Sequence, residues 1–266
     1  MGGRSPPMVA TIVTRYVDTV DVGGIAFRIS CRYPKPGFWA QSRPQFLTAR
    51  APDVVVDMTY QDDFRRRARL PAGQDTFSDA PTVRRNGQAM LLSTAYYRAR
   101  ADLRRGCVAV QIAAGFGVVN LMRTLAALWL LERGTVLLRA IRLGRDGTTL
   151  ACGIPAEALG VSHGGAVAGH LAVTPGPRGV TTRLTPFLEG DGPLPARREA
   201  RARVLWVPGG SAGARAAAVL LPAIWQADRR RAALVRTLDL ATRIVAGLRC
   251  HEIGVGACED KDVAVG

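Results

Sequence analysis

The stretch CVAVQIAAGFGVVNLMRTLAALWLLE, residues 107–132, decides the fold because the spacing of its apolar residues changes within it. Cys107 to Ile112 has the alternation of a strand with one polar face. From Val118 to Glu132 the apolar residues return at helical spacing, and Gly134 ends the predicted helix. The chain therefore divides near Gly115 into a part built from strands and a part that mixes strands and helices.

The first part predicts strands at residues 10–16, 25–31 and 53–60, with a turn at Asp21 to Gly24. Asn86-Gly87 predicts a hairpin between residues 82–85 and 88–93, because both central residues of its turn need a positive φ. Tyr97 to Leu103 alternates buried-type residues with arginines and an aspartate, which predicts a second hairpin with residues 107–112.

The second part predicts short strands at 136–141, 148–152 and 204–207, a helix at 214–221 and a last strand at 251–255. Residues 195–203 are expected to form a basic loop. The clearest helix is Asp228 to Leu248, with Asp228 as N-cap and with a stripe that must face a core, formed by Leu234, Leu238, Ala241, Val245 and Leu248. The fold class is α+β, with a β-rich N-terminal domain over residues 1–115 and an α/β domain over residues 116–266.

The composition is strongly basic. Lys+Arg number 36 against 21 for Asp+Glu, a net charge of +15 over 266 residues, which predicts affinity for anionic partners at low salt. Arginine, alanine and glycine are all abundant, so coding bias explains part of this charge. The lysines are Lys35 and Lys261 alone, a pair that excludes a Schiff-base enzyme and an orthodox Walker A ATPase.

The compartment is predicted from the cysteines and from the start of the chain. Five scattered cysteines without a C-x-x-C pair, and the start MGGRSPP without an apolar stretch, predict a reduced, cytoplasmic protein. The most apolar run, Leu125 to Leu131, has seven residues and is too short to span a bilayer. We therefore expect no transmembrane helix.

Three segments carry a resemblance to a known family: LLSTAYYRARADL (91–103), GTVLLRAIRLGRDGTTLACG (134–153) and LLPAIWQADRRRAALVRTLDLATRIV (220–245). They resemble HPr kinase-related proteins, whose C-terminal domain shares the P-loop core of ATP-dependent phosphoenolpyruvate carboxykinase. The resemblance covers most of the chain from about residue 50. It implies that the C-terminal half is a truncated P-loop-type α/β domain like that of HPr kinase.

The resemblance places the phosphate loop at Gly153 to Gly160. Gly153 matches the first glycine of G-x-x-x-x-G-K-[ST], whereas Ala158, Leu159 and Gly160 stand where the motif has glycine, lysine and Ser/Thr. The lysine and hydroxyl of that motif neutralise phosphate charge and hold Mg²⁺. The family's acidic pair corresponds to Gly169-His170, neither a carboxylate. The resemblance thus implies a degenerate relative without phosphotransfer, and no bound cofactor.

Three functions remain open on the sequence. The first is a regulatory component that binds a protein or peptide, since relatives of this family occur beside peptide-modification systems. The second is an active kinase of a protein or small metabolite, which would need ATP and Mg²⁺ with phosphates held by Arg178 or Arg183. The third is an anion- or nucleic-acid-binding module, with Arg215 beside the Gly209–Gly213 turn or the arginine runs at 65–69 and 229–231.

The remaining candidates are expected to be structural. Nucleic acid is disfavoured because the arginine runs lack interleaved aromatic residues. Ser162-His163 has the pattern of loop residues rather than of a catalytic pair. Cys250, His251 and Cys258 lack the paired spacing of a zinc site, so no metal is expected.

Overall fold

The computed structural model describes residues 15–32, 43–61, 81–86, 89–113, 117–144, 146–155, 159, 166–189, 194–195, 197–210 and 214–253. Within these residues the fold is α+β and rich in strands. It contains two mixed sheets, each with seven strands, and three α-helices.

The first sheet has the strand order β1-β2-β3-β7-β6-β5-β4. The pairs β2–β3 and β3–β7 are parallel, and the other neighbours are antiparallel. A 3-10 turn, η1, lies at Pro44–Phe46. The strands are β1 Arg15–Val22, β2 Ile25–Arg32, β3 Val54–Tyr60, β4 Thr82–Asn86, β5 Ala89–Ser93, β6 Tyr97–Asp102 and β7 Cys107–Ile112.

The second sheet has the order β12-β11-β10-β8-β9-β13-β14. Its β9–β13 and β13–β14 pairs are parallel, and the other neighbours are antiparallel. The strands are β8 Val136–Leu143, β9 Thr149–Ala151, β10 Ala166–Gly176, β11 Gly179–Leu188, β12 Glu199–Ala202, β13 Val204–Pro208 and β14 Arg249–Ile253.

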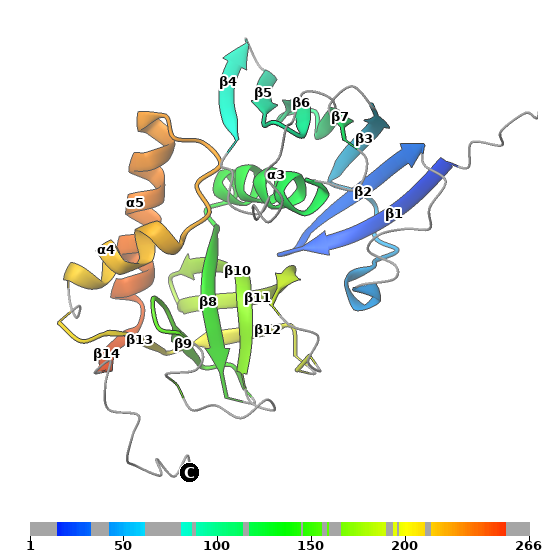
Figure 1. Ribbon diagram of the computed structural model, residues 1–266. Helices are drawn as coiled ribbons and strands as arrows, with labels where there is room; N and C mark the ends of the chain where they lie inside the picture. The colour runs from blue at the N-terminus through cyan, green and yellow to red at the C-terminus, as the bar shows by residue number, and fades with distance from the viewer. Residues whose placement is uncertain are drawn as a thin grey trace, which may run out of the picture.

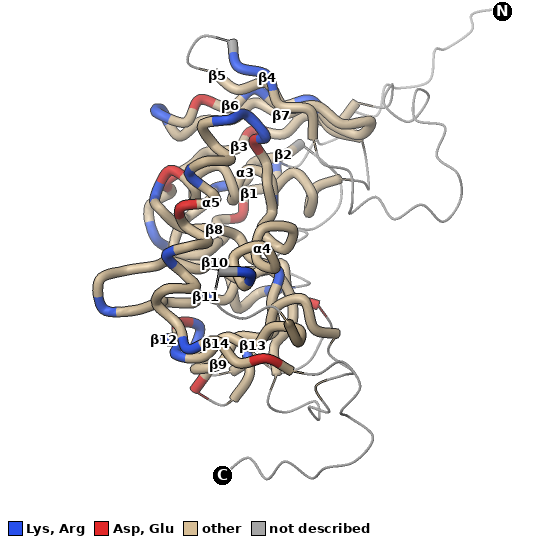
Figure 2. The backbone as a smooth tube through the Cα atoms, turned by 90° about the vertical axis from the view of Figure 1, so that its left-hand side faces the viewer, with Lys and Arg blue, Asp and Glu red and all other residues tan. Residues whose placement is uncertain are grey.

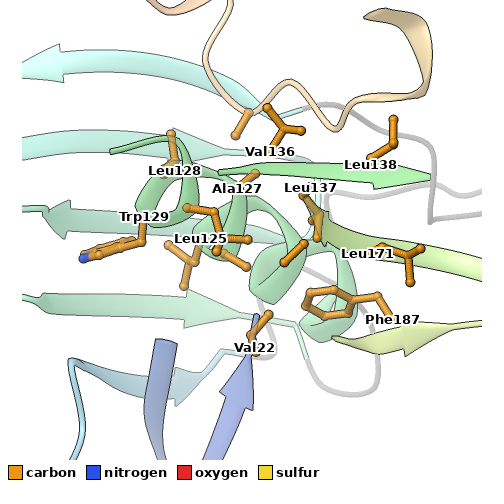
Figure 3. Packing of buried hydrophobic residues seen from close by; sticks show 14 of the residues in the cluster. Val22, Leu125, Ala127, Leu128, Trp129, Val136, Leu137, Leu138, Leu171 and Phe187 are labelled. Carbon is orange, nitrogen blue, oxygen red and sulfur yellow. The ribbon is translucent and has the colours of Figure 1, made fainter. Parts of the chain in front are cut away.

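The helix α3, Val118–Glu132, lies between the two sheets (Figure 1). All residues from Asn120 to Leu130 except Arg123 are buried, which is the pattern of a helix surrounded by protein. Figure 3 shows Leu125 and Trp129 of α3 in one cluster with Val22 of β1, Leu137 of β8 and Phe187 of β11. The main hydrophobic core therefore runs through both sheets without a break.

Specific contacts fix α3 against the first sheet. The rings of Trp129 and Phe27 meet edge to face with centroids 6.2 Å apart. The Tyr97 hydroxyl donates to Asn120 Oδ1 at 3.1 Å, which gives two buried polar groups a partner. The sheet face that carries Tyr97 and Phe27 is thus sealed by α3.

A carboxylate joins the C-terminal end of α3 to the same sheet. Asp53 accepts hydrogen bonds from the Ala26 N–H at 2.8 Å, from Arg50 at 2.8 Å and from Arg133 at 3.0 Å. Burial alone would raise the pKa of Asp53, but these hydrogen bonds and the two positive charges lower it overall. The carboxylate stays ionised and links β2, the segment before β3 and α3.

The helices α4, Ala214–Ala223, and α5, Arg231–Ala246, lie together against β8 and β10 (Figure 1). Gly247, just after α5, approaches Val180 of β11. Leu130 of α3 instead lies beside Ala172 at the Gly23 turn. Val180 pairs with Pro175, and alternate residues of a strand point to opposite faces, so α3 and α5 cover opposite faces of the second sheet.

Much of the predicted secondary structure is confirmed. The helix at 118–132 and the strand at 107–112 have the predicted bounds, and β4 and β5 form the predicted hairpin, with residues 87–88 of its turn outside the described residues. The turn after β1 is also confirmed. Gly23 and Gly24 have φ values of 63° and 93°, as a two-residue hairpin turn requires.

Four predictions about the elements are wrong. The strand predicted at residues 10–16 does not end at Tyr16 but continues to Val22; residues 15 and 16 lie in β1, and residues 10–14 lie outside the described residues. β10 and β11 were not predicted, because glycines and prolines interrupt the pattern; a register shift between Gly169 and Leu171 accommodates the irregularity. The predicted basic loop at 195–203 contains β12 and pairs with β11.

The fourth error concerns α5, which begins at Arg231 with Arg230 as N-cap rather than Asp228. Its buried residues are Thr237, Leu240, Ala241 and Ile244. Leu234 and Leu238 of the predicted core stripe are instead exposed. The predicted domain boundary at 115/116 lies outside the described residues.

Candidate functional site

The outer face of the first sheet, opposite α3, carries a concave surface. On β6, the buried Tyr97, Ala99 and Ala101 alternate with the exposed Arg98 and Arg100. The other central strands alternate in the same way, so their outward residues form one polar face.

The strand register sets these residues in two rows. The first row runs across the sheet through residues that are paired in turn: Arg84 on β4, Leu91 on β5, Arg100 on β6, Ala109 on β7 and Asp57 on β3. The second row is made in the same way by Thr82, Ser93, Arg98, Gln111 and Thr59. Side chains directly opposite on neighbouring strands lie within contact distance, so each row is a continuous strip.

The two rows line a hollow of about 700 Å³. Small and medium side chains, Ala109, Ser93 and Thr59, lie along it, whereas Arg84, Arg98 and Arg100 stand on one side. A volume of this size matches that of ligand-binding clefts. The hollow can hold an extended peptide segment along the strands.

The charge of the hollow is positive, because three arginines line it against one aspartate, Asp57. Arg84 and Arg100 form no hydrogen bond or ion pair with any residue that the structure describes. Asp57 is the acidic residue of the rows, and it lies 3.9 Å from Arg15, with both side chains more than half exposed. An anionic group in the hollow would therefore meet the guanidinium groups of Arg84 and Arg100, which suit bidentate binding of carboxylate or phosphate.

The hollow also reaches an edge of the sheet. β4 is the last strand in the described order, so one side of its backbone faces away from β5. In Figure 2 the arginine positions gather around β4 and β6 at the upper end of the molecule. An edge strand offers unpaired N–H and C=O groups to an added strand.

These arginines were not among the sequence-predicted site residues. The alternation of Arg98 and Arg100 with buried neighbours was visible in the sequence and predicted the polar face, which is confirmed. What the alternation could not reveal is the order β7-β6-β5-β4, which places Arg84 beside Leu91 and Arg100.

The segment aligned with a phosphate loop follows β9. Gly153 has φ of 72° and lies against Pro208 and Val219, so it joins β9 to β13 and α4. Leu159 packs with the small apolar cluster around Ile141. Ala158 and Gly160 lie outside the described residues, and the residues described between β9 and the start of β10 at Ala166 include no α-helix.

The three sequence-predicted anion-binding arginines lie on separate elements. Arg178 is exposed in the turn between β10 and β11. Arg183 on β11 donates to Glu199 of β12, so its charge already has a partner. Arg215, at the start of α4, donates weakly to the Gly210 carbonyl at 3.4 Å. No hydrogen bond or ion pair between described residues joins these three arginines.

His170 is buried in an aromatic and cationic setting. Its ring meets that of Trp225 edge to face at 5.7 Å, and the Arg123 guanidinium lies 4.8 Å from the Trp225 ring. Burial, together with the charges of Arg123 and Arg139, lowers the pKa of His170 to about 3. The imidazole is neutral at physiological pH, and no carboxylate among the described residues pairs with it to make it a strong base.

The cysteines and the possible metal ligands are the remaining candidate residues. Burial raises the pKa of the Cys152 thiol to about 12, so this thiol is unreactive. Among the described residues, no three His, Cys, Asp or Glu side chains come together in a group that could hold a metal ion. Cys258, Ser162 and His163 lie outside them, and no helix in the described parts is long and apolar enough to cross a membrane.

Comparison with known proteins adds no assignment. No protein-family model matches the chain, and neither a curated protein nor a solved structure matches it.

Proposed function

We propose that this protein is a non-catalytic binding module that holds an acidic, extended peptide segment of a protein partner on the outer face of the first sheet. The observation that carries the proposal is the hollow of about 700 Å³ in which Arg84 and Arg100 face solvent without a described partner. The segment would lie along β4, with carboxylates directed to the arginines.

Three features support a peptide over other ligands. β4 is an edge strand, and addition of a strand to such an edge is a common mode of peptide binding. Leu91, 37% exposed, lies between Arg84 and Arg100 and can contact an apolar side chain. The outward residues of the described strands in both rows include no aromatic side chain, whereas single-stranded nucleic acid is bound by stacking on aromatic rings.

The non-catalytic part of the proposal keeps the resemblance to HPr kinase-related proteins and its degenerate, truncated P-loop-type half. Two observations support it. Ten residues, 156–165, lie between Pro155 and the start of β10. If a phosphate loop extended through Gly160, only five of them would be left for the helix that follows the loop in a P-loop protein. Leu159, at the lysine position, packs with apolar residues instead of facing a phosphate.

The test is a titration of the full chain with labelled peptides, followed by fluorescence anisotropy at about 0.15 M salt, where exposed charges are partly screened. The probe alternates Glu with Val over about ten residues, and the comparison peptides replace Glu by Lys or replace Val by Gly. We expect only the Glu-Val peptide to bind saturably, because it supplies both charge and strand propensity.

Two double variants locate the site. R84A/R100A should weaken binding by about tenfold or more, because two charge-assisted contacts are lost. R104A/R105A removes the same charge from the exposed turn between β6 and β7 and should change binding little. Equal losses in both variants, or equal binding of all three peptides, would contradict the proposal.

A second assay distinguishes the proposed binding module from the alternative, an active kinase. Any ligand that binds only the folded state raises stability by RT ln(1 + [L]/Kd). We expect no change in the melting temperature with Mg·ATP at millimolar concentration. A saturable, Mg²⁺-dependent rise that survives moderate salt would favour the active kinase instead.

A further inference from the structure

Helix α5 carries an apolar patch on its solvent side, formed by Leu234, Val235 and Leu238. These side chains are 38%, 59% and 48% exposed. Residues separated by three and four positions adjoin on a helix surface, so the three side chains form one continuous α5 patch. The buried side of the helix is made by other residues, Leu240, Ala241 and Ile244 among them.

The α5 patch is unusual within this molecule. Among the residues that the structure describes, the other exposed large hydrophobic ones are Val17, Val55 and Leu91, and they lie on three separate strands of the first sheet. The three neighbouring side chains are only partly buried, so covering them would remove further apolar surface from water, which favours association. Contiguous exposed apolar side chains rimmed by polar residues are typical of a protein–protein contact.

The charges around the patch indicate what covers it. Arg229 and Arg231, at its N-terminal end, are exposed and form no ion pair with described residues. The acidic groups nearby already have partners, because Glu132 pairs with Arg236 at 3.2 Å and Asp239 with Arg243 at 3.8 Å. The uncompensated charge beside the patch is therefore positive.

A second copy of the chain does not complement this surface. In an antiparallel pair of α5 helices, the Arg229–Arg231 end of each helix would lie near Arg243 of the other. Each chain also carries a net charge of +15, which adds repulsion at long range. An acidic partner complements both the patch and its rim.

We infer that the α5 patch binds an acidic amphipathic helix of a protein partner. Two or three large apolar side chains of that helix cover Leu234, Val235 and Leu238, and its carboxylates face Arg229 and Arg231. This is the binding mode in which one apolar helix face packs on a hydrophobic surface. The α5 patch shares no residue with the hollow of the first sheet, so each of the two proposed binding sites can be disproved independently of the other.

The experiment uses the full chain and a fluorescein-labelled peptide of about 18 residues, long enough to form a helix on contact. The peptide places Leu at helical spacing on one face and Glu on the other positions. One comparison peptide has the same composition in an order without an apolar face, and another has Lys in place of Glu. We expect saturable binding of the first peptide alone, measured by fluorescence anisotropy at about 0.15 M salt.

Two variants of the protein and one control test the assignment. L234S/L238S should weaken binding by about tenfold or more, because two apolar contacts are lost. R229E/R231E should weaken the Glu peptide and strengthen the Lys peptide. V17S/V55S removes two exposed apolar residues elsewhere and should leave the affinity unchanged. Urea unfolding of each variant confirms that the fold is kept.

Several results would overturn the inference. One is binding of the reordered peptide as tight as that of the amphipathic one. Another is an equal loss of affinity in L234S/L238S and V17S/V55S, since the contact would then lie elsewhere. A concentration-dependent dimer in sedimentation, present in the wild type and absent in L234S/L238S, would assign the patch to a second copy of the chain.

Discussion

The two sheets have equal numbers of strands but different surroundings. In the second sheet, α3 covers one face, and α4 and α5 cover the other, so its strands serve mainly as core. In the first sheet, α3 covers one face, and no described element covers the other. The two sheets therefore differ in exposure although they have the same number of strands: cover by helices, and not strand number, decides whether a sheet has an accessible face. The accessible hollow belongs to the sheet that has helix cover on one face.

The largest loss of stability is expected when the packing of α3 is weakened, because both sheets pack on this helix. Leu125→Ala removes a fully buried side chain between the sheets and should lower the free energy of unfolding by roughly 3 kcal/mol. Urea unfolding followed by circular dichroism measures this loss. Leu91→Ala, on the outer face, is the control and should cost less than about 1 kcal/mol.

The same unfolding curves test whether the halves are separate domains. Because the core runs through both sheets, we expect Leu125→Ala to shift one cooperative transition as a whole. Two transitions, of which the substitution moves only one, would favour independent domains over residues 1–115 and 116–266.

A buried arginine distinguishes the interior of the second sheet from the arginines of the hollow. Arg142 is 2% exposed and donates to the carbonyls of Arg197 at 2.6 Å and Arg198 at 3.1 Å. Arg142→Met leaves two carbonyl groups without their donors and should lower stability by about 2 kcal/mol. Arg139→Met, which removes an exposed ion pair with Glu189, should cost less than about 1 kcal/mol in the same denaturation assay.

The buried His170 of the second sheet makes the stability of the protein depend on pH. Its pKa is lowered to about 3 in the folded protein from 6.5, so the unfolded chain binds more protons between these values. The contribution of His170 to stability is therefore complete above pH 6.5 and is lost as the pH falls toward 3. Urea midpoints measured across this range should fall less steeply in His170→Gln than in the wild type.

The control for this effect is His251→Gln, which removes a histidine from the surface and not from the core. Parallel curves for His170→Gln and the wild type would show that carboxylates such as Asp53, whose pKa is lowered, carry the acid sensitivity instead.

The smallest effect on stability is expected in the hollow itself. R84A/R100A removes two exposed charges without described partners from a chain of net charge +15, so the melting temperature should stay the same or rise slightly. Differential scanning fluorimetry measures it. A fall equivalent to more than about 1 kcal/mol would mean that these arginines hold the sheet together rather than wait for a ligand.

The sequence predicted elements whose pattern is settled locally. The helix at 118–132 has a long 3.6-residue period, and Gly134 ends it, so its bounds needed no tertiary information. The hairpin of β4 and β5 followed from Asn86-Gly87 in the same way. By contrast, β10 and β11 carry Gly169, Pro175 and Pro186, and their pairing depends on β8, which precedes them by more than twenty residues.

The candidate surfaces were harder to predict for the same physical reason. The apolar stripe of α5 was visible, but only the packing of α4 and β10 against it decides that Leu240 is buried and Leu238 exposed. The polar face of β6 was predicted, yet its neighbours come from strand order. The family resemblance placed the predicted phosphate loop around Gly153, which belongs to neither surface.

The position of α3 in the chain has a consequence for biosynthesis. All strands of the first sheet are complete at Ile112, but the helix that seals their apolar face ends at Glu132. The strands that seal the other side of α3 continue to Leu188. A growing chain therefore exposes the apolar face of the first sheet for about twenty residues of further synthesis, and then the uncovered side of α3 for about fifty-five more. Apolar surface that is exposed in this way favours aggregation of the incomplete chain.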